Sequence, residues 1–191
     1  RNPKQIQNFN DQKSKRLEFE NSNLNIVSNF DIRASNFILS ASKFVAYANQ
    51  LNLLRGYARL AEKNPTTPSL WFAGGVHDKR YFAKVMRYVE DNCLQDRVKF
   101  LGLVPHDQLL ELMRQARAFV FPSTLESCPH TLIEAMACGA SIAVSTTPPM
   151  PEICVDSAVY FTVNDPDDIA DKIERVLIDG ELRERLAHAG P

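Results

Sequence analysis

The stretch Phe121-Pro-Ser-Thr-Leu-Glu-Ser-Cys-Pro-His-Thr-Leu-Ile-Glu134, which continues through Ala-Met-Ala-Cys-Gly, has the pattern of a strand, a loop and a helix. The apolar run 118–121 predicts a buried strand. Pro129 suits the first turn of a helix, where its missing N–H costs nothing. Apolar residues then repeat at helical spacing, and Gly139 stands where a helix C-cap would be. A second strand is expected at 141–145, immediately after the helix.

Two carboxylates stand in this stretch, Glu126 in the loop and Glu134 in the helix, with seven residues between them. The helix that begins between them presents free backbone N–H groups, which suit an anion. Glu134 lies about one and a half turns inside the helix, near where the ribose of a bound nucleotide could lie. Alone, the pattern is ambiguous, because a glutamate in a helix is commonly solvated and a strand–loop–helix unit is generic.

The composition is that of one globular domain with a core. The chain has 191 residues, 45% of them hydrophobic, and a net charge of −1. That charge gives no electrostatic reason to expect nucleic acid or an anionic membrane as partner. No apolar run approaches the roughly 20 residues that span a bilayer. The chain begins at Arg1 without a signal peptide, so we expect a fragment or a processed chain.

The cysteines Cys93, Cys128, Cys138 and Cys154 lack the paired spacing of a zinc site. We interpret them as free thiols in a reducing compartment, which indicates a cytoplasmic protein. One alternative stays open: Cys128 and His130 could form a nucleophile–base pair, although they are close in sequence.

Strand-like and helix-like segments alternate from residue 37 onward, which predicts an α/β fold with a doubly wound, Rossmann-like parallel sheet of five or six strands. We expect a polar N-terminal segment and connector at 1–31 and one domain at 32–191. The expected strands are 37–40, 69–73, 98–101, 118–121, 141–145 and 158–161. The expected helices, beside the one after Pro129, are 49–63, 79–91, 107–116, 166–178 and 181–189.

Ligands of such sheets bind at the carboxyl ends of the strands. The candidate site therefore comprises the loops that follow the strands, namely 41–49, 74–77, 102–104, 122–131 and 146–152.

Glu126 and Glu134 are accompanied, in order, by Phe-Pro-Ser, Glu-Ala-Met-Ala-Cys-Gly and Pro151-Glu152. This combination resembles the signature of the nucleotide-sugar-dependent glycosyltransferases of family 4, which are retaining enzymes of the GT-B fold. Residues 37–189 resemble the C-terminal, donor-binding half of such an enzyme. The resemblance implies transfer of a sugar from a nucleotide-diphosphate-sugar to an acceptor with retention. It implies no metal and no cofactor besides this donor.

The resemblance also assigns roles to residues of the quoted stretch. It makes Glu134 the ligand of the donor ribose, and a carboxylate can accept from both vicinal hydroxyls. Glu126 would lie near the transferred sugar as a catalytic residue. The backbone N–H groups of His130, Thr131 and Leu132 would approach the diphosphate and sugar.

Two further loops match the family. Leu103 and Val104, in Gly102-Leu-Val104, resemble the turn whose backbone recognises the nucleobase, a role compatible with a plain connector. Gly74 and Gly75 resemble the glycines that close the second strand and let backbone approach the ligand, although a Gly-Gly pair after a strand is common.

The phosphate side departs from the family. The family carries Gly-Arg after the first strand and a lysine about six residues on, whereas this chain reads Ser40-Ala-Ser-Lys-Phe-Val-Ala-Tyr-Ala-Asn49. Lys43 can replace the arginine as a catalytic cation, though without its bidentate fork, unless it is merely a solvated loop lysine. Tyr47 or Ala48 occupies the lysine position, so a cation is missing there.

This loss supports an alternative function, a non-catalytic nucleotide-sugar-binding module of a degenerate glycosyltransferase. A Rossmann-type dehydrogenase is disfavoured because G-x-G-x-x-G is absent after the first strand.

We expect the family's second domain, which holds the acceptor site and a catalytic histidine, to be absent from this sequence. We expect it as the partner of this chain, and the fragment alone to be inactive. Any membrane contact would come through that domain, since no transmembrane segment is expected here. His77, His106 and His188 are interpreted as surface histidines. His130 is the exception, at the presumed phosphate-binding helix start.

Overall fold

Six parallel strands form one sheet in the computed structural model, which describes residues 36–190. Their order is β3-β2-β1-β4-β5-β6, so the direction of winding reverses between β1 and β4. The predicted doubly wound α/β sheet is therefore confirmed, and the expected segment 1–31 lies outside the described residues. The strands are β1 (Phe37–Ala41), β2 (Ser69–Ala73), β3 (Val98–Gly102), β4 (Ala118–Phe121), β5 (Ile142–Ser145) and β6 (Ala158–Phe161).

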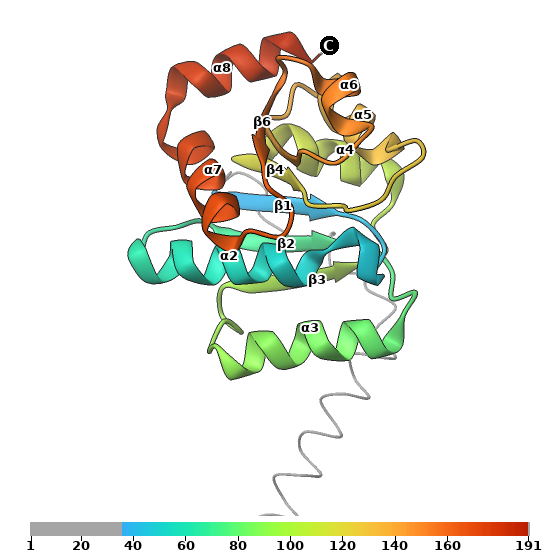
Figure 1. Cartoon of the computed structure of the whole chain (residues 1–191), viewed down its shortest axis with the longest axis vertical. Helices are drawn as coiled ribbons and strands as arrows, with labels where there is room; N and C mark the ends of the chain where they lie inside the picture. The colour runs from blue at the N-terminus through green and yellow to red at the C-terminus, as the bar shows by residue number, and fades with distance from the viewer. Residues whose placement is uncertain (1–35, 191) are drawn as a thin grey trace, which may run out of the picture. The chain divides into compact units, whose positions relative to one another are not determined.

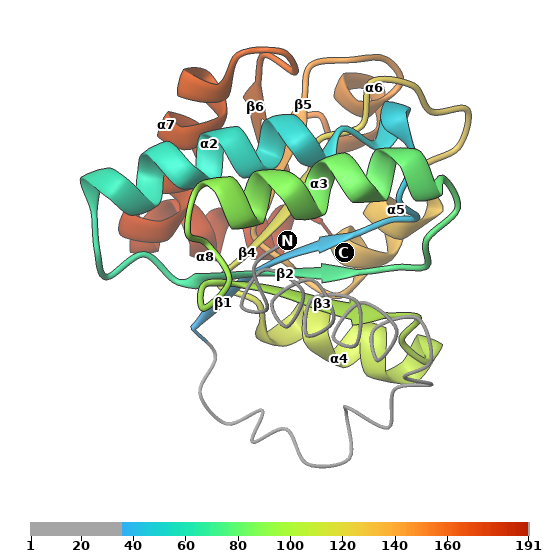
Figure 2. The same ribbon diagram turned by 90° about the horizontal axis from the view of Figure 1, so that it is seen from below.

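Helices cover both faces of the sheet. Figures 1 and 2 show α2, α3 and α7 along one face and α4 on the other. Every residue of β1, β4 and β5 is buried, as expected for central strands of a parallel sheet between two helical layers. The helices are α2 (Gln50–Lys63), α3 (Lys79–Asp91), α4 (His106–Gln115), α5 (His130–Ala137), α6 (Met150–Cys154), α7 (Pro166–Ile178) and α8 (Gly180–Ala189), with a 3₁₀ turn, η2 (Ala46–Ala48).

Capping residues determine where α5 and α7 begin and end. Asp165 is the N-cap of α7, and its carboxylate accepts hydrogen bonds from the N–H groups of Asp167 and Asp168. Gly139 ends α5 with a φ of +70°, a conformation that favours glycine. Pro129 lies one residue before the first helical residue of α5, where its carbonyl accepts from Leu132 N–H.

Two short helical elements were predicted as loop. The 3₁₀ turn η2 falls inside the loop expected at 41–49, and α6 overlaps the loop expected at 146–152. Both are too short to show a helical repeat of apolar residues. The prediction was wrong there because periodicity needs several turns to become visible.

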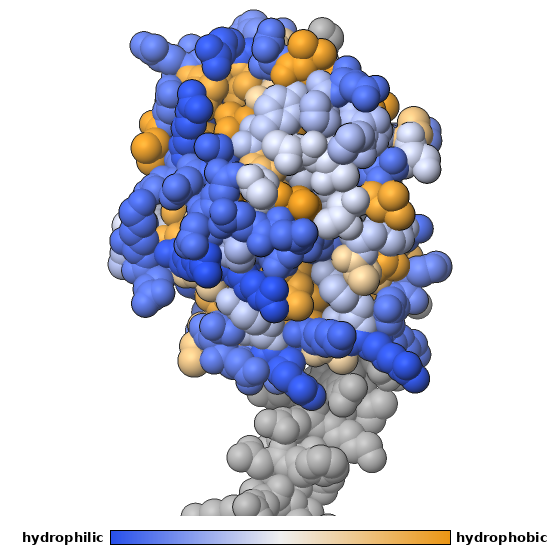
Figure 3. All heavy atoms as spheres, in the orientation of Figure 1, coloured by the Kyte–Doolittle hydropathy of each residue, from blue (hydrophilic) through white to orange (hydrophobic). Residues whose placement is uncertain are grey.

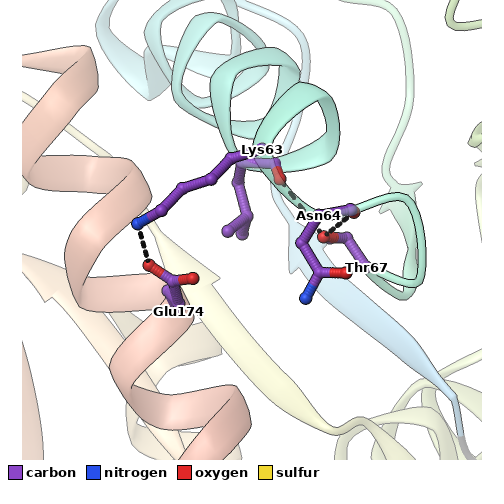
Figure 4. A network of polar contacts seen from close by, with 5 residues as sticks. Lys63, Asn64, Thr67 and Glu174 are labelled. Atoms are coloured by element: carbon purple, nitrogen blue, oxygen red, sulfur yellow. Dashed lines mark hydrogen bonds and ion pairs between the residues drawn. The ribbon is translucent and has the colours of Figure 1, made fainter.

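The helices α2 and α7 pack side by side over the sheet. Figure 4 shows the polar contacts at the end of α2, where Lys63 Nζ lies 2.7 Å from Glu174 Oε2 of α7. In the turn that follows, Thr67 Oγ1 donates to the carbonyl of Asn64 at 2.7 Å. These bonds fix the connection from α2 to β2 at the edge of the core.

The face seen in Figure 3 is mostly hydrophilic, with apolar residues in scattered groups. Between residues 36 and 190, no helix combines the length and the apolar composition that a membrane crossing requires.

Candidate functional site

Two loops meet at the point where the winding of the sheet reverses. The carbonyl of Tyr47, in the loop after β1, accepts from Thr124 N–H at 2.7 Å and from Thr124 Oγ1 at 3.0 Å. Ser123 Oγ donates to the same carbonyl at 3.2 Å. Such a reversal is where doubly wound sheets bind ligands. The hydrogen bonds make the loops after β1 and β4 one structural unit at this place.

Asn49, which was not among the predicted site residues, reinforces this unit. Its Nδ2 donates to the carbonyls of Pro122, at 3.1 Å, and Val163, at 2.9 Å, and so joins the loops after β1, β4 and β6. The side chain is buried, and the backbone has a φ of +60°. Asparagine tolerates this left-handed conformation better than most residues. An asparagine at the expected start of a helix is the one sequence signal that could have indicated this residue.

Replacing Asn49 by alanine should lower the free energy of unfolding by about 2–4 kcal/mol, because two carbonyls lose their donor and alanine is strained at positive φ. Asn49→Gly removes the same bonds without the strain and should cost about 1 kcal/mol less. Urea denaturation of both variants measures the difference. Equal losses in the two variants would show that the backbone conformation contributes nothing.

Lys43 lies on the same unit, and its side chain reaches Tyr47. Its Nζ is 5.6 Å from the centroid of the Tyr47 ring. The Tyr47 side chain raises the pKa of Lys43, desolvation lowers this pKa, and the charge of Glu126 raises it. Lys43 therefore stays protonated at neutral pH. Ala48, at the other candidate position for the family's second cation, is buried.

The two glycines after β2 pack against the chain itself. A Cβ on Gly74 would lie 2.0 Å from the carbonyl oxygen of Ser42, and the residue has a φ of +144°. A Cβ on Gly75 would lie 3.0 Å from Leu103 Cδ2. Gly74 thus has a structural reason in the close approach of backbone, whereas the atoms near Gly75 belong to the exposed side chain of Leu103. Their contact with a ligand stays a prediction.

The loop after β3 presents an apolar side chain to solvent. Leu103 is 81% exposed, Val104 is half-buried, and Gly102 before them has a φ of +66°. The turn is tied to β2 by a 2.7 Å hydrogen bond from Gly74 N–H to the Gly102 carbonyl. Its predicted role toward a nucleobase stays a prediction.

The three backbone N–H groups predicted at the start of α5 are not equivalent. His130 N–H donates to the Cys128 carbonyl and Leu132 N–H to the Pro129 carbonyl, each at 2.9 Å. Within residues 36–190, Thr131 N–H has no acceptor. Thr131 is therefore the amide best placed to receive an anion at this helix start. The side chain of Leu132 is fully buried and anchors the helix to the core.

Cys128 and His130 do meet, with 3.7 Å between Sγ and Nε2, and both residues are exposed. This distance is compatible with a nucleophile–base pair, and that role for Cys128 and His130 stays a prediction. Within the described part of the chain, no three His, Cys, Asp or Glu side chains cluster so as to hold a metal ion.

Glu134 faces the start of α4. Its Oε1 lies 3.9 Å from His106 Nδ1, and the two side chains are 35% and 61% exposed. His106 was predicted to be a surface histidine, and it is exposed, but its proximity to Glu134 was not foreseen. The two residues are on different helices, so no local spacing in the sequence relates them.

A hollow of about 430 Å³ lies away from these loops, at the amino ends of β4 and β5. The hollow is lined by Arg114, Gln115, Ala116, Arg117, Gly139, Ser141, Arg183 and Glu184. Arg117 and Arg183 stabilise the end of α7, because both donate hydrogen bonds to the Leu177 carbonyl, at 3.3 and 2.7 Å.

A sequence profile described as glycosyl transferases group 1 matches residues 26–191. O-antigen chain mannosyltransferase B of Escherichia coli is 34% identical over 96 residues, which are 50% of this chain and 25% of that protein.

Solved structures share the fold. The crystal structure of Anabaena Alr3699/HepE in complex with UDP-glucose matches with a TM-score of 0.75 and 17% identity, over 100% of this chain and 47% of that one. The C-terminal domain of LpcC, a glycosyl transferase group 1 family protein of Francisella tularensis, matches with a TM-score of 0.71 and 19% identity, over 81% of this chain and 82% of that domain. The chain thus spans a quarter of the mannosyltransferase and just under half of HepE.

Proposed function

We propose, from the premise that this chain belongs to the glycosyl transferases group 1 family, that it is the donor-binding part of a retaining, family 4 type glycosyltransferase. Its donor would be a nucleotide-diphosphate-sugar. One observation carries the proposal: hydrogen bonds from Thr124 to the Tyr47 carbonyl join the loop of Lys43 to the loop of Glu126, which leads into the start of α5. The two loops thus bring a cation, a carboxylate and a helix N-terminus to the same edge of the sheet.

The chemistry of these groups suits a diphosphate leaving group. Thr131 N–H and the positive end of the α5 dipole would face the phosphates. Lys43, protonated at neutral pH, would stabilise the negative charge that develops as the bond from the anomeric carbon to the diphosphate oxygen breaks. The acceptor oxygen would form the new bond on the same face and lose its proton to the departing diphosphate. Glu134 would hold the ribose through its two hydroxyls.

The comparisons support the class of donor. HepE was crystallised with UDP-glucose, and the mannosyltransferase bears the name of a sugar-transferring enzyme. Because this chain spans only part of both, the acceptor site and the complete reaction are assigned to a second domain as partner. We also propose that the protein is cytoplasmic, because the nucleotide sugars that such a site would use as donors are found there.

The alternative, a binding module without catalysis, has one observation in its favour. The position at which the family has its second cation is occupied by half-buried Tyr47 or buried Ala48. The negative charge of a leaving diphosphate would therefore be less well stabilised here.

Isothermal titration calorimetry tests binding. The chain is titrated with UDP, GDP and ADP, and with the nucleoside of each. We expect one diphosphate to bind measurably and its nucleoside to bind more weakly, because the nucleoside cannot reach Lys43 or the helix start. Binding of none of the three would contradict the proposal.

A longer protein that contains both domains separates catalysis from binding. Incubated with the sugar conjugate of the bound nucleotide, it should release the diphosphate, and NMR of the product should show the donor's anomeric configuration. Binding without release would favour the non-catalytic alternative.

A further inference from the structure

Tyr47 is half-buried in η2, and its ring lies beside the ammonium group of Lys43. The 5.6 Å between Nζ and the ring centroid is within the range of a cation–π interaction. The Tyr47 ring therefore attracts the one cation that is predicted for the phosphate side.

The backbone of Tyr47 is fixed from the other side. Its carbonyl receives the three hydrogen bonds from Ser123 and Thr124, at 2.7, 3.0 and 3.2 Å. The buried Asn49 follows two residues later and is itself bonded to Pro122 and Val163. The ring is thus carried by the most strongly braced part of the loop, whereas Lys43 is exposed and has a flexible side chain.

Glu126 is the competitor for Lys43. The bonds from Thr124 to Tyr47 join its loop to the loop of Lys43, yet in the described part of the chain no carboxylate oxygen lies within the 4.0 Å of an ion pair with Lys43 Nζ. A flexible lysine next to a carboxylate would otherwise be drawn onto it. A cation paired with Glu126 would be less available to a phosphate, and that glutamate less available to a sugar.

We propose that Tyr47 is a positioning residue that holds Lys43 off Glu126 and toward the diphosphate of the donor. This inference rests on the proposed function and adds to it. Tyr47 stands where the family has a second cation. By orienting Lys43, it would compensate in part for the missing charge. Tyr47 acts through Lys43 and makes no bond to the reacting atoms.

The test compares Tyr47→Leu with the unsubstituted chain by calorimetry, using the diphosphate of the UDP, GDP and ADP panel that the chain binds, and its nucleoside. Loss of the cation–π contact should weaken diphosphate binding about three- to tenfold. Nucleoside binding should not change, since it does not involve Lys43. Tyr47→Phe, which keeps the ring, should retain most of the diphosphate binding and guards against misfolding of the leucine variant.

A double-mutant cycle shows whether Tyr47 acts through the lysine. In a Lys43→Met background, Tyr47→Leu should weaken diphosphate binding no further. Lys99→Met is the matched control, because Lys99 also lies over an aromatic ring, 4.8 Å from the centroid of Trp71, but within β3. It should leave diphosphate binding unchanged.

The outcomes separate the two proposals. Full additivity of Tyr47→Leu and Lys43→Met, or equal weakening of diphosphate and nucleoside, would overturn the positioning role. Unchanged diphosphate binding in Tyr47→Leu, together with weakened binding in Glu134→Ala, would also overturn the positioning role, and the proposed function would then stand. If the unsubstituted chain binds no diphosphate, the proposed function itself fails, and the positioning role fails with it.

Discussion

Replacement of Gly74 by alanine is expected to destabilise the chain by about 2–5 kcal/mol, from overpacking and backbone strain together. The added Cβ would lie 2.0 Å from the oxygen and 2.6 Å from the carbon of the Ser42 carbonyl, which are backbone atoms that cannot turn away. The φ of +144° at Gly74 is in addition unfavourable for any residue with a Cβ. Thermal and urea denaturation followed by circular dichroism measure the loss.

Gly180→Ala is the matched control for this prediction. Gly180 is the first residue of α8, has ordinary backbone angles, and the atom nearest to an added Cβ is Arg183 Nη2 at 3.6 Å. Its replacement should change the free energy of unfolding by no more than about 0.5 kcal/mol. If both alanine variants were equally stable, the close approach of the loops after β1 and β2 would not exist as described. Ser42 immediately precedes Lys43, so displacement of this loop should also disturb the site.

Most of the fold could be predicted because its elements carry both periodicity and end signals. The bounds predicted for β2, α3, β4, β6 and α7 agree with the structure. Asp78, for example, caps α3 by accepting from Arg80 N–H and Tyr81 N–H, so the helix begins where the apolar repeat begins. The two elements that were not predicted, η2 and α6, are too short to show an apolar repeat.

The candidate site was predictable only where one continuous stretch carries it. Glu126 and Glu134 share the stretch around the start of α5, and their spacing relates both to that helix. The contacts of Asn49 with Pro122 and Val163, and of Glu134 with His106, join segments far apart in sequence. Such contacts depend on the order of strands in the sheet, which no local pattern encodes.

Glu134→Ala should have the largest effect on ligand binding. If the carboxylate accepts hydrogen bonds from both ribose hydroxyls, its removal should weaken nucleotide diphosphate binding about 10- to 100-fold, as expected for hydrogen bonds to a charged group. Calorimetry with the diphosphate that the chain binds measures this loss. Glu62→Ala is a matched control, because Glu62 is an exposed glutamate on α2, and it should leave binding unchanged.

The sharper readout is discrimination between ribose and deoxyribose. The unsubstituted chain should bind the ribonucleoside diphosphate about tenfold more tightly than its 2′-deoxy analogue, because one acceptor interaction of the carboxylate is lost with the hydroxyl. Glu134→Ala should bind both equally, whereas Lys43→Met should weaken both and keep their ratio. His106, 3.9 Å from the carboxylate, provides a further check: His106→Ala should preserve discrimination if Glu134 itself contacts the sugar. Discrimination that survives in Glu134→Ala would place the ribose elsewhere, and the assignment of this glutamate would be wrong.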